Sequence, residues 1–171
     1  EWAGVTQRVT VLDDSGADRV MERREIPFAY RSSGITDAIV IEVEVELAAE
    51  DPERLNERVA ELFQWRQEGT PFNQPCCGST FRNPGGVSGV VEGGPRTAGQ
   101  LIEAAGFKGV REGAIEVSQM HANYFVNTGG GSAEDARRLI RRVRQAVQEQ
   151  LDVTLETEVK IIGPDGHYRS P

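Results

Sequence analysis

The chain has 171 residues, of which 38% are hydrophobic and 27% charged, a composition typical of one globular domain or of a domain joined to part of another. Acidic residues outnumber basic ones by 27 to 19, and the net charge of −8 argues against general binding to nucleic acids or anionic membranes, which requires clustered positive charge. No apolar run approaches the roughly 18 residues of a membrane span, and the first residues lack the basic and apolar regions of a signal peptide.

The first third of the chain predicts two strands and a helix. Residues 5–13 alternate partly and end in a turn at 14–16. Residues 39–47 repeat with a period of two, which predicts a half-buried strand whose apolar face is formed by Ile39, Ile41, Val43, Val45 and Leu47. Residues 51–67 predict an amphipathic helix, because Asp51 can cap it, a proline follows, and apolar residues recur at helical spacing.

The middle of the chain is rich in glycine, and we expect loops over residues 69–95. Thr97 can then cap a short helix that Gly106 ends. A short strand is expected at 124–126.

The last third predicts one long helix and one strand. Ser132 and Asp135 resemble a capping box, and an apolar stripe follows them. Beside that stripe lie four arginines that we interpret as a solvated face rather than an anion site: Arg137, Arg138, Arg141 and Arg142. Residues 153–162 alternate and predict a terminal strand, followed by a turn at 164–166 and a short tail. Together these elements predict a mixed α+β fold.

The only two cysteines, Cys76 and Cys77, are adjacent, and neighbouring residues rarely form a disulfide. We therefore expect reduced thiols and a cytoplasmic protein. The residues alone allow Cys77 and His121 to act as a thiolate–imidazole pair, although a structural role for adjacent cysteines in a loop is the more common case. The two histidines and two cysteines lack the spacing of a metal site, so we expect no metal.

The segment 76–84 is a more specific candidate for a binding loop. Small residues around Gly78 let the main chain approach a ligand, and the side chains of Ser79, Arg82 and Asn83 offer a hydroxyl, a guanidinium and an amide on a short arc. A capped turn would carry the same composition. Residues 129–131 precede a helix but lack the lysine of a phosphate-binding P-loop.

Two further residues could reach such a loop. Arg31 lies in an irregular segment and Glu158 on the polar face of the predicted last strand. From the residues alone, a surface ion pair for Arg31 and a solvated carboxylate for Glu158 are the more common cases.

Five blocks of the chain, in order, resemble the C-terminal part of the UDP-N-acetylenolpyruvoylglucosamine reductase family (UDP-N-acetylmuramate dehydrogenases), flavoenzymes of peptidoglycan synthesis. They include the Tyr-Arg-x-Ser block, the Gly-Ser-x-Phe block and the Val-x-Ile-Ile-Gly ending, and they occupy residues 28–33, 73–84, 98–109, 121–127 and 155–163. The resemblance implies the end of a PCMH-type FAD-binding lobe at residues 1–66, a small α+β substrate-binding domain at 67–163, and a tail at 164–171.

The same resemblance implies a reaction in which NADPH reduces bound FAD, and the flavin delivers hydride to the enolpyruvyl group of UDP-N-acetylglucosamine enolpyruvate. It makes Ser79 the proton donor, and Arg31 and Glu158 the groups that stabilise the enol-like intermediate. It also places Asn83, His121 and Asn123 in the substrate pocket, and it makes Tyr30 and Gly78 cofactor-binding residues. The complete protein is expected to be a monomer without nucleic-acid or membrane partners.

The chain departs from the family pattern in several places. The N-terminal flavin-binding region with its glycine-rich loop is not present, and the chain begins with Glu1 rather than methionine, so we expect it to be part of a longer protein. Thr157 stands where proline is usual, and residues 87–96 look longer and richer in glycine than expected. The spacing between Arg31 and Ser79 indicates the shorter subtype of the family. Two alternatives stay open: a UDP-sugar-binding module without catalysis, and a cysteine-dependent hydrolase.

Overall fold

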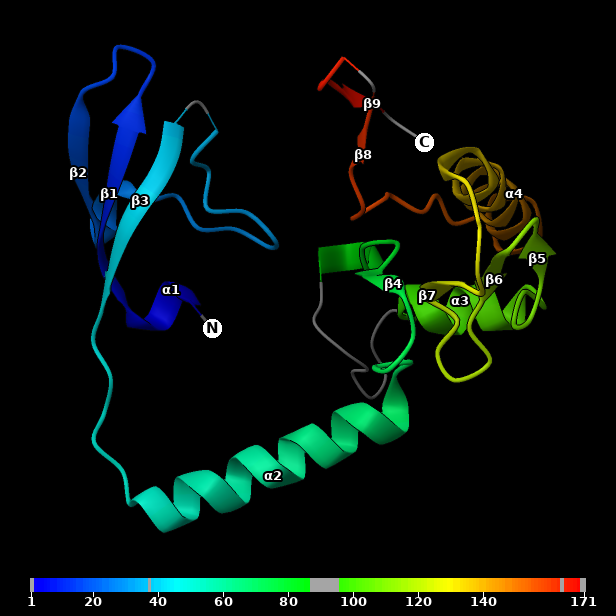
Figure 1. The fold of residues 1–171 in the computed structure, drawn as a ribbon, viewed down its shortest axis with the longest axis horizontal. Helices are drawn as coiled ribbons and strands as arrows, with labels where there is room; N and C mark the ends of the chain where they lie inside the picture. The colour runs from blue at the N-terminus through cyan, green and yellow to red at the C-terminus, as the bar shows by residue number, and fades with distance from the viewer. Residues whose placement is uncertain (1, 37, 87–95, 164, 170–171) are drawn as a thin grey trace. The chain divides into compact units, whose positions relative to one another are not determined.

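The computed structural model describes residues 2–36, 38–86, 96–163 and 165–169 (Figure 1). The chain divides into two compact units, Glu1–Asn56 and Glu57–Pro171. Its elements are, in chain order, α1 (Trp2–Val5), β1 (Thr6–Asp13), β2 (Asp18–Glu22), η1 (Arg23–Glu25), β3 (Ala38–Val45), α2 (Pro52–Gly69), β4 (Cys76–Ser79), η2 (Pro84–Gly86), α3 (Ala98–Ala104), β5 (Arg111–Glu112), β6 (Ile115–Val117), β7 (Tyr124–Asn127), α4 (Ala133–Leu151), β8 (Ile161–Ile162) and β9 (Tyr168–Arg169).

The first unit is built on a three-stranded antiparallel sheet with the strand order β2-β1-β3. The predicted strands β1 and β3 are confirmed, whereas β2 lies in a polar stretch that carries no alternation and was not predicted. A small core of Val9, Val11 and Ile26 lies on one face of this sheet. The sheet therefore depends on few apolar contacts.

The prediction of one continuous apolar face on β3 is wrong, because the strand contains a β-bulge. Val43 pairs with Val9, but Val40 pairs with Val11, so Ile41 is an extra residue without a partner in the register. A bulge shifts the alternation by one residue, and side chains beyond it change faces. Ile39, which pairs with Leu12, consequently lies on the face opposite Val43, and β3 is exposed along most of its length.

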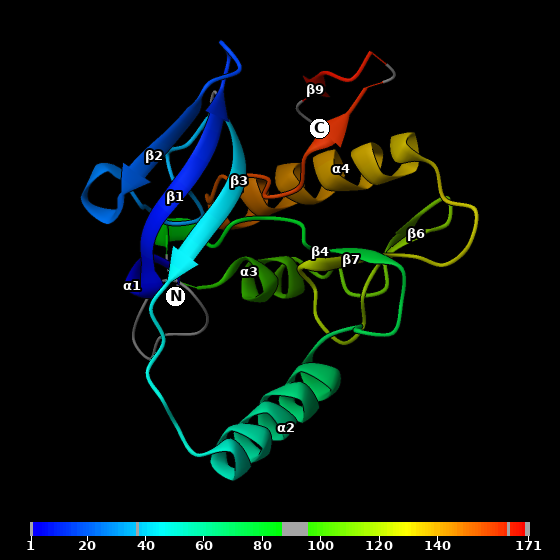
Figure 2. The same ribbon diagram turned by 60° about the vertical axis from the view of Figure 1, so that its left-hand side comes forward.

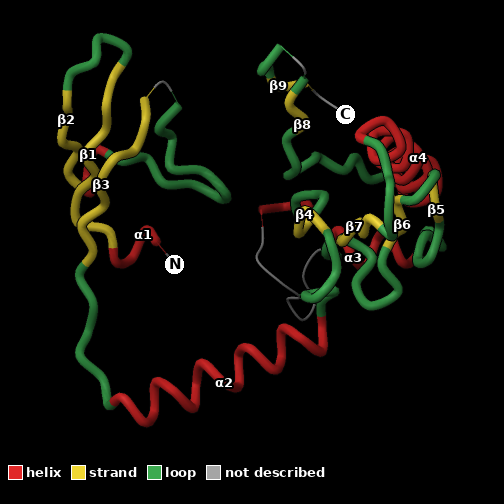
Figure 3. Tube along the Cα trace, viewed as in Figure 1, coloured by secondary structure: helices red, strands yellow, loops and turns green. Residues whose placement is uncertain are grey.

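Helix α2 confirms the prediction for residues 51–67, and the Asp51 carboxylate accepts a hydrogen bond from the Glu53 main chain at 2.8 Å. Every residue from 52 to 69 is exposed, including the apolar stripe Leu55, Val59, Leu62 and Phe63. Figure 3 shows α2 as a helix with loop segments at both ends. Among the helices that the structure describes, none is both long and apolar enough to cross a membrane.

The second unit is a two-layer α/β arrangement. Its sheet has the antiparallel order β4-β7-β6-β5, and α3 and α4 pack with it around one core (Figure 2). The predicted apolar stripe of α4 is confirmed, because Leu139, Ile140, Val143 and Val147 are buried. Both predicted caps are also confirmed: Thr97 accepts a hydrogen bond from the Gln100 main chain, and Ser132 accepts one from that of Asp135. The mixed α+β prediction is confirmed.

The predicted loop at 69–95 contains two ordered elements, β4 and η2, and its residues 87–95, including most of the glycine-rich stretch, lie outside the described residues. Strand β4 was not recognised because it is only four residues long and contains a glycine. It is nevertheless the element that ends at Ser79.

The predicted strand at 153–162 is wrong as a continuous element. Only Ile161–Ile162 form a strand, β8, and the residues before them make a single bridge between Thr157 and Phe81. The described part of the tail returns as β9, which pairs with β8, and the Gly163 main chain donates a hydrogen bond of 2.8 Å to the carbonyl oxygen of His167. Alternation in residues 153–160 reflects one buried side chain, Leu155, rather than pairing along a full ladder.

Candidate functional site

The candidate site is built around the end of β4. Gly78 has a φ of 80°, a left-handed conformation that favours glycine, and no atom of the described residues lies within 4 Å of the position that a Cβ would take there. Ser79 follows and pairs with Tyr124 of β7. The expectation that a ligand can come close to the main chain at Gly78 therefore agrees with the conformation of this residue and the open space beside it.

The structure brings Ser79 and Glu158 onto neighbouring segments. The carbonyl oxygen of Thr80 accepts a hydrogen bond of 2.9 Å from the Glu158 main chain, and the Arg82 main chain donates one of 2.8 Å to the carbonyl oxygen of Glu156. These two bonds flank the Phe81–Thr157 bridge. Residues 80–82 and 156–158 therefore run side by side.

Asn83 connects the end of this segment to α3. Its Oδ1 atom accepts a hydrogen bond of 2.9 Å from the main chain of Ala98, the first residue of the helix. One of the unpaired N–H groups of the helix start is thereby satisfied. The buried Nε atom of Arg82 has no hydrogen-bond partner in the described part of the chain.

His121 is held from several sides. Its Nδ1 atom accepts a hydrogen bond of 3.2 Å from the Asn123 main chain, and its ring makes an edge contact with Tyr124 at a centroid distance of 5.0 Å. A Cβ atom on Gly99 would lie 2.9 Å from the ring, so only glycine lets the ring pack there. Burial lowers the pKa of His121 below its ordinary value, which favours a neutral ring with its proton on Nε2.

Asn123 is almost fully buried, at 3% exposure. Its Nδ2 atom donates to the carbonyl oxygen of Phe81 at 2.8 Å, and its Oδ1 atom accepts from the Phe81 main chain at 2.9 Å. The carboxamide thus binds the main chain of the segment that follows Ser79. Sequence reasoning singled out Asn123 without this contact, because a bond to a main chain 42 residues away leaves no local pattern.

Tyr30 and Arg31 lie in the first unit, at the tip of a tight turn closed by the pair Ala29 and Ser32. Arg31 has a φ of 57°, although a residue with a Cβ disfavours this region. Its guanidinium lies 5.8 Å from the centre of the Tyr30 ring, within the range of a cation–π contact. Strained conformations of this kind are concentrated at functional positions.

Cys77 does not have the properties of an activated nucleophile. Both thiols are free. Packing around its sulfur raises the pKa of the Cys77 thiol, an effect that the nearby Thr80 hydroxyl opposes only in part. A thiol with a raised pKa stays protonated at neutral pH and reacts slowly.

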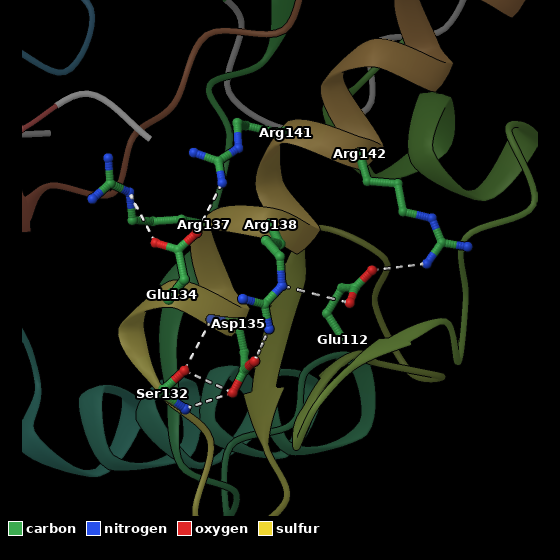
Figure 4. A network of polar contacts seen from close by, with 8 residues as sticks. All are labelled: Glu112, Ser132, Glu134, Asp135, Arg137, Arg138, Arg141 and Arg142. Atoms are coloured by element: carbon green, nitrogen blue, oxygen red, sulfur yellow. Dashed lines mark hydrogen bonds and ion pairs between the residues drawn. The ribbon is translucent and has the colours of Figure 1, made fainter.

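The arginine face of α4 is paired with carboxylates of the chain itself (Figure 4). Arg141 lies 3.0 Å from Glu134 and Arg142 lies 3.2 Å from Glu112, while Arg138 binds Asp135. Hydrogen bonds from Ser132 lower the pKa of Asp135 and keep it ionised. Arg138, Arg141 and Arg142 are exposed, as the interpretation as a solvated face expects, whereas Arg137 is partly buried. Within the described ranges, no three His, Cys, Asp or Glu side chains converge as metal ligands.

A protein-family model described as the C-terminal domain of UDP-N-acetylenolpyruvoylglucosamine reductase matches residues 70–162. The UDP-N-acetylenolpyruvoylglucosamine reductase of Rubrobacter xylanophilus is 44% identical, covering 95% of this chain and 52% of the relative. Reductase 1 of Bacillus cereus is 36% identical, covering 94% and 52%. A crystal structure of the Thermus caldophilus reductase matches with a TM-score of 0.74 and 36% identity, covering 91% of this chain and 52% of the other. The chain thus spans about half the length of these relatives.

Proposed function

Since the chain belongs to the UDP-N-acetylenolpyruvoylglucosamine reductase family, matching its C-terminal domain, we propose that it supplies the substrate-binding and proton-donating part of a FAD- and NADPH-dependent reductase. The reaction is the reduction of UDP-N-acetylglucosamine enolpyruvate to UDP-N-acetylmuramate, a cytoplasmic step of peptidoglycan precursor synthesis. The observation that carries the proposal is the placement of Ser79 and Glu158 on neighbouring segments, joined through Thr80 inside the matched domain.

Ser79 is proposed to donate the proton that completes the reduction. A serine hydroxyl is a weak acid, so it protonates only a strongly basic centre held within hydrogen-bond reach. The carbon next to the carboxylate becomes such a centre once hydride has been added to the enolpyruvyl group. Ser79 is partly exposed at the end of β4, where a bound substrate can reach its hydroxyl.

Arg31 and Glu158 are proposed to stabilise the intermediate that precedes this proton transfer. Hydride addition builds negative charge on the substrate, and a guanidinium keeps its positive charge at any working pH. Glu158 is proposed to act on this intermediate through a hydrogen bond. The strained backbone of Arg31 supports a functional rather than a structural role for that residue.

Bound FAD would supply hydride transfer from NADPH to the substrate. The open space above Gly78, where a side chain would otherwise project, fits the close approach of a flat ring system. Tyr30, half-buried beside Arg31, is the other proposed cofactor contact. Asn83 and His121 are proposed to contact the UDP-sugar.

The length of the chain favours a second candidate, a UDP-sugar-binding module without turnover, because the chain spans only about half of its relatives. A visible absorbance spectrum after addition of FAD and desalting separates the two. Retained flavin absorbance supports a cofactor site within these residues. A colourless protein that binds UDP-N-acetylglucosamine enolpyruvate supports the module, and a protein that binds neither contradicts both.

The catalytic proposal is tested by Ser79→Ala in an enzyme completed with the N-terminal half of the Rubrobacter xylanophilus reductase. Flavin reduction by NADPH should stay nearly unchanged, while flavin reoxidation by the substrate slows about 10²–10⁴-fold, the typical contribution of a positioned proton donor. Cys77→Ser, two residues away, is the matched control and should leave both rates unchanged. An unaltered reoxidation rate in Ser79→Ala would remove this serine from the mechanism.

A further inference from the structure

Residues Thr80–Arg82 form a short segment whose main chain is held from both sides. On one side, Asn123 accepts from the Thr80 main chain at 2.8 Å and exchanges two hydrogen bonds with Phe81. On the other side, the segment bonds to Glu156 and Glu158. Each main-chain donor and acceptor from the Thr80 nitrogen to the Arg82 nitrogen therefore has a partner.

The carboxamide of Asn123 continues the pairing of β4 with β7 beyond its last main-chain pair. Ser79 pairs with Tyr124, the first residue of β7, and Asn123 comes immediately before that strand. A carboxamide offers one acceptor and donors in nearly the same arrangement as a peptide group. The Asn123 side chain therefore takes the place that the main chain of a longer β7 would have occupied.

We propose that Asn123 is a positioning residue, whose carboxamide fixes the segment that ties Ser79 to Glu158. The proposal rests on the proposed function, in which these two side chains act on one substrate. Ser79 is bonded directly to Thr80, and Glu158 is held by the Thr80 carbonyl oxygen, so a displacement of this segment moves both. His121 is coupled to it as well, because its Nδ1 atom accepts from the Asn123 main chain.

Because Asn123 is only 3% exposed, water cannot easily replace its hydrogen bonds to the segment Thr80–Arg82 when the side chain is removed. Without the carboxamide, the N–H and C=O groups of Phe81 lose their partners in a site with little access to water. The segment must then shift to find new partners. Misplacement of reacting groups by about 1 Å lowers a rate on the order of 10²-fold.

The first test measures amide hydrogen exchange in the full chain by NMR. Asn123→Ala should lower the protection of the Phe81 amide by about tenfold or more, because its acceptor is removed. The matched control is Asn127→Ala, at the other end of β7, where the side chain binds Gly129 and Gly131 instead. Unchanged Phe81 protection in Asn123→Ala would overturn the proposal, whatever ligand the chain binds.

The second test uses Asn123→Asp and the affinity for UDP-N-acetylglucosamine enolpyruvate, measured by calorimetry between about pH 5 and 8. A protonated aspartic acid can still accept from the Phe81 N–H and donate to the Phe81 carbonyl, whereas an ionised one has no donor. Affinity in this variant should therefore fall about tenfold or more as pH rises and approach that of the unsubstituted chain at low pH. Asn127→Asp should follow the pH profile of the unsubstituted chain.

The titratable or charged residues on the segments paired or bonded around Asn123 are His121, Tyr124, Cys77, Arg82, Glu156 and Glu158, and Lys108 and Glu103 act on His121. All of these groups are present in every variant, the Asn127→Asp control included. Binding by Asn123→Asp that matches the unsubstituted chain at every pH would overturn the positioning role. An unsubstituted chain without affinity for the substrate contradicts the proposed function instead, and the Phe81 amide then decides on Asn123 alone.

Discussion

The two compact units differ in how completely their apolar residues are covered. In the second unit, fourteen buried residues from two strands, two helices and the segments between these elements share one core. In the first unit, the corresponding core has three buried residues, while the apolar side chains of β3 stay exposed. Since buried apolar area dominates folding free energy, the stability of the chain should reside in the second unit.

The largest expected contrast is between two leucines in helices, one from each unit. Leu139→Ala, at a fully buried position of α4, should lower the free energy of unfolding by about 2–5 kcal/mol. Leu55→Ala, at a position of α2 that is 48% exposed, should change it by no more than about 0.5 kcal/mol. Urea denaturation followed by circular dichroism measures both. Equal losses of unfolding free energy in the two variants would mean that the apolar stripe of α2 is covered in solution. The proposed difference between the two units would then be wrong.

The helix caps give a smaller contrast of the same kind. Ser132→Ala removes the cap of α4, whose apolar face is buried, and should lower the free energy of unfolding by about 1 kcal/mol. Asp51→Ala removes the cap of α2, which is exposed throughout, and should reduce helical signal without changing the main unfolding transition. A loss of about 1 kcal/mol in Asp51→Ala would show that α2 unfolds together with the core.

Local sequence patterns predicted the helices and caps of the second unit. They failed to predict strand pairing, which depends on residues far apart in the chain. The α4 stripe and the caps at Thr97 and Ser132 follow from spacing, because each depends on residues within a few positions. The bulge at Ile41 does not, since it is defined by the register against β1. The same limit applies to residues 153–160, where alternation could not show that only Thr157 finds a strand partner.

In the candidate site, too, sequence motifs identify residues but do not show their long-range contacts. Ser79, Arg31 and Glu158 were identified through the family resemblance, because motifs record residue identity. The contacts of Asn123 with Phe81 required coordinates, since they join residues 42 positions apart. The strain at Arg31 is likewise a property of the backbone that no sequence pattern displays.

His121 should make the second unit sensitive to mild acid. Its pKa is lowered in the folded state, first of all by burial, so the unfolded chain binds the proton more readily. Stability should therefore be constant above the ordinary histidine pKa of about 6.5 and decline as pH falls from there through the folded-state pKa. The measurement is urea denaturation between about pH 7.5 and 5, above the range in which most carboxylates titrate. His121→Gln should remove the decline and His167→Gln should retain it; a decline that persists in His121→Gln assigns it to another group.

The smallest expected effect on stability distinguishes two residues that share an unfavourable backbone conformation, Arg31 in the first unit and Asp152 in the second. Asp152 ends α4, and aspartate tolerates left-handed geometry at helix ends, so its conformation has a structural reason. Arg31 is the third residue of its four-residue turn, a position that some turn types hold at positive φ but usually fill with glycine or asparagine. Left-handed strain of about 1–2 kcal/mol exceeds the added flexibility of glycine, about 0.5–1 kcal/mol, so Arg31→Gly should stabilise the chain by up to about 1 kcal/mol. Asp152→Gly should change stability less.

Arg31→Ala is the control that separates strain from charge, because it removes the guanidinium but keeps the Cβ atom. In the enzyme completed with the N-terminal half of a relative, both Arg31 variants should lose flavin reoxidation by the substrate, and Asp152→Gly should retain it. Arg31→Gly would then be more stable than Arg31→Ala, and both would be inactive. This result is expected where a residue has a strained backbone because its side chain is needed for function. If instead Arg31→Gly is less stable than Arg31→Ala, the turn does not hold stored strain at this residue, and the geometric support for Arg31 is lost.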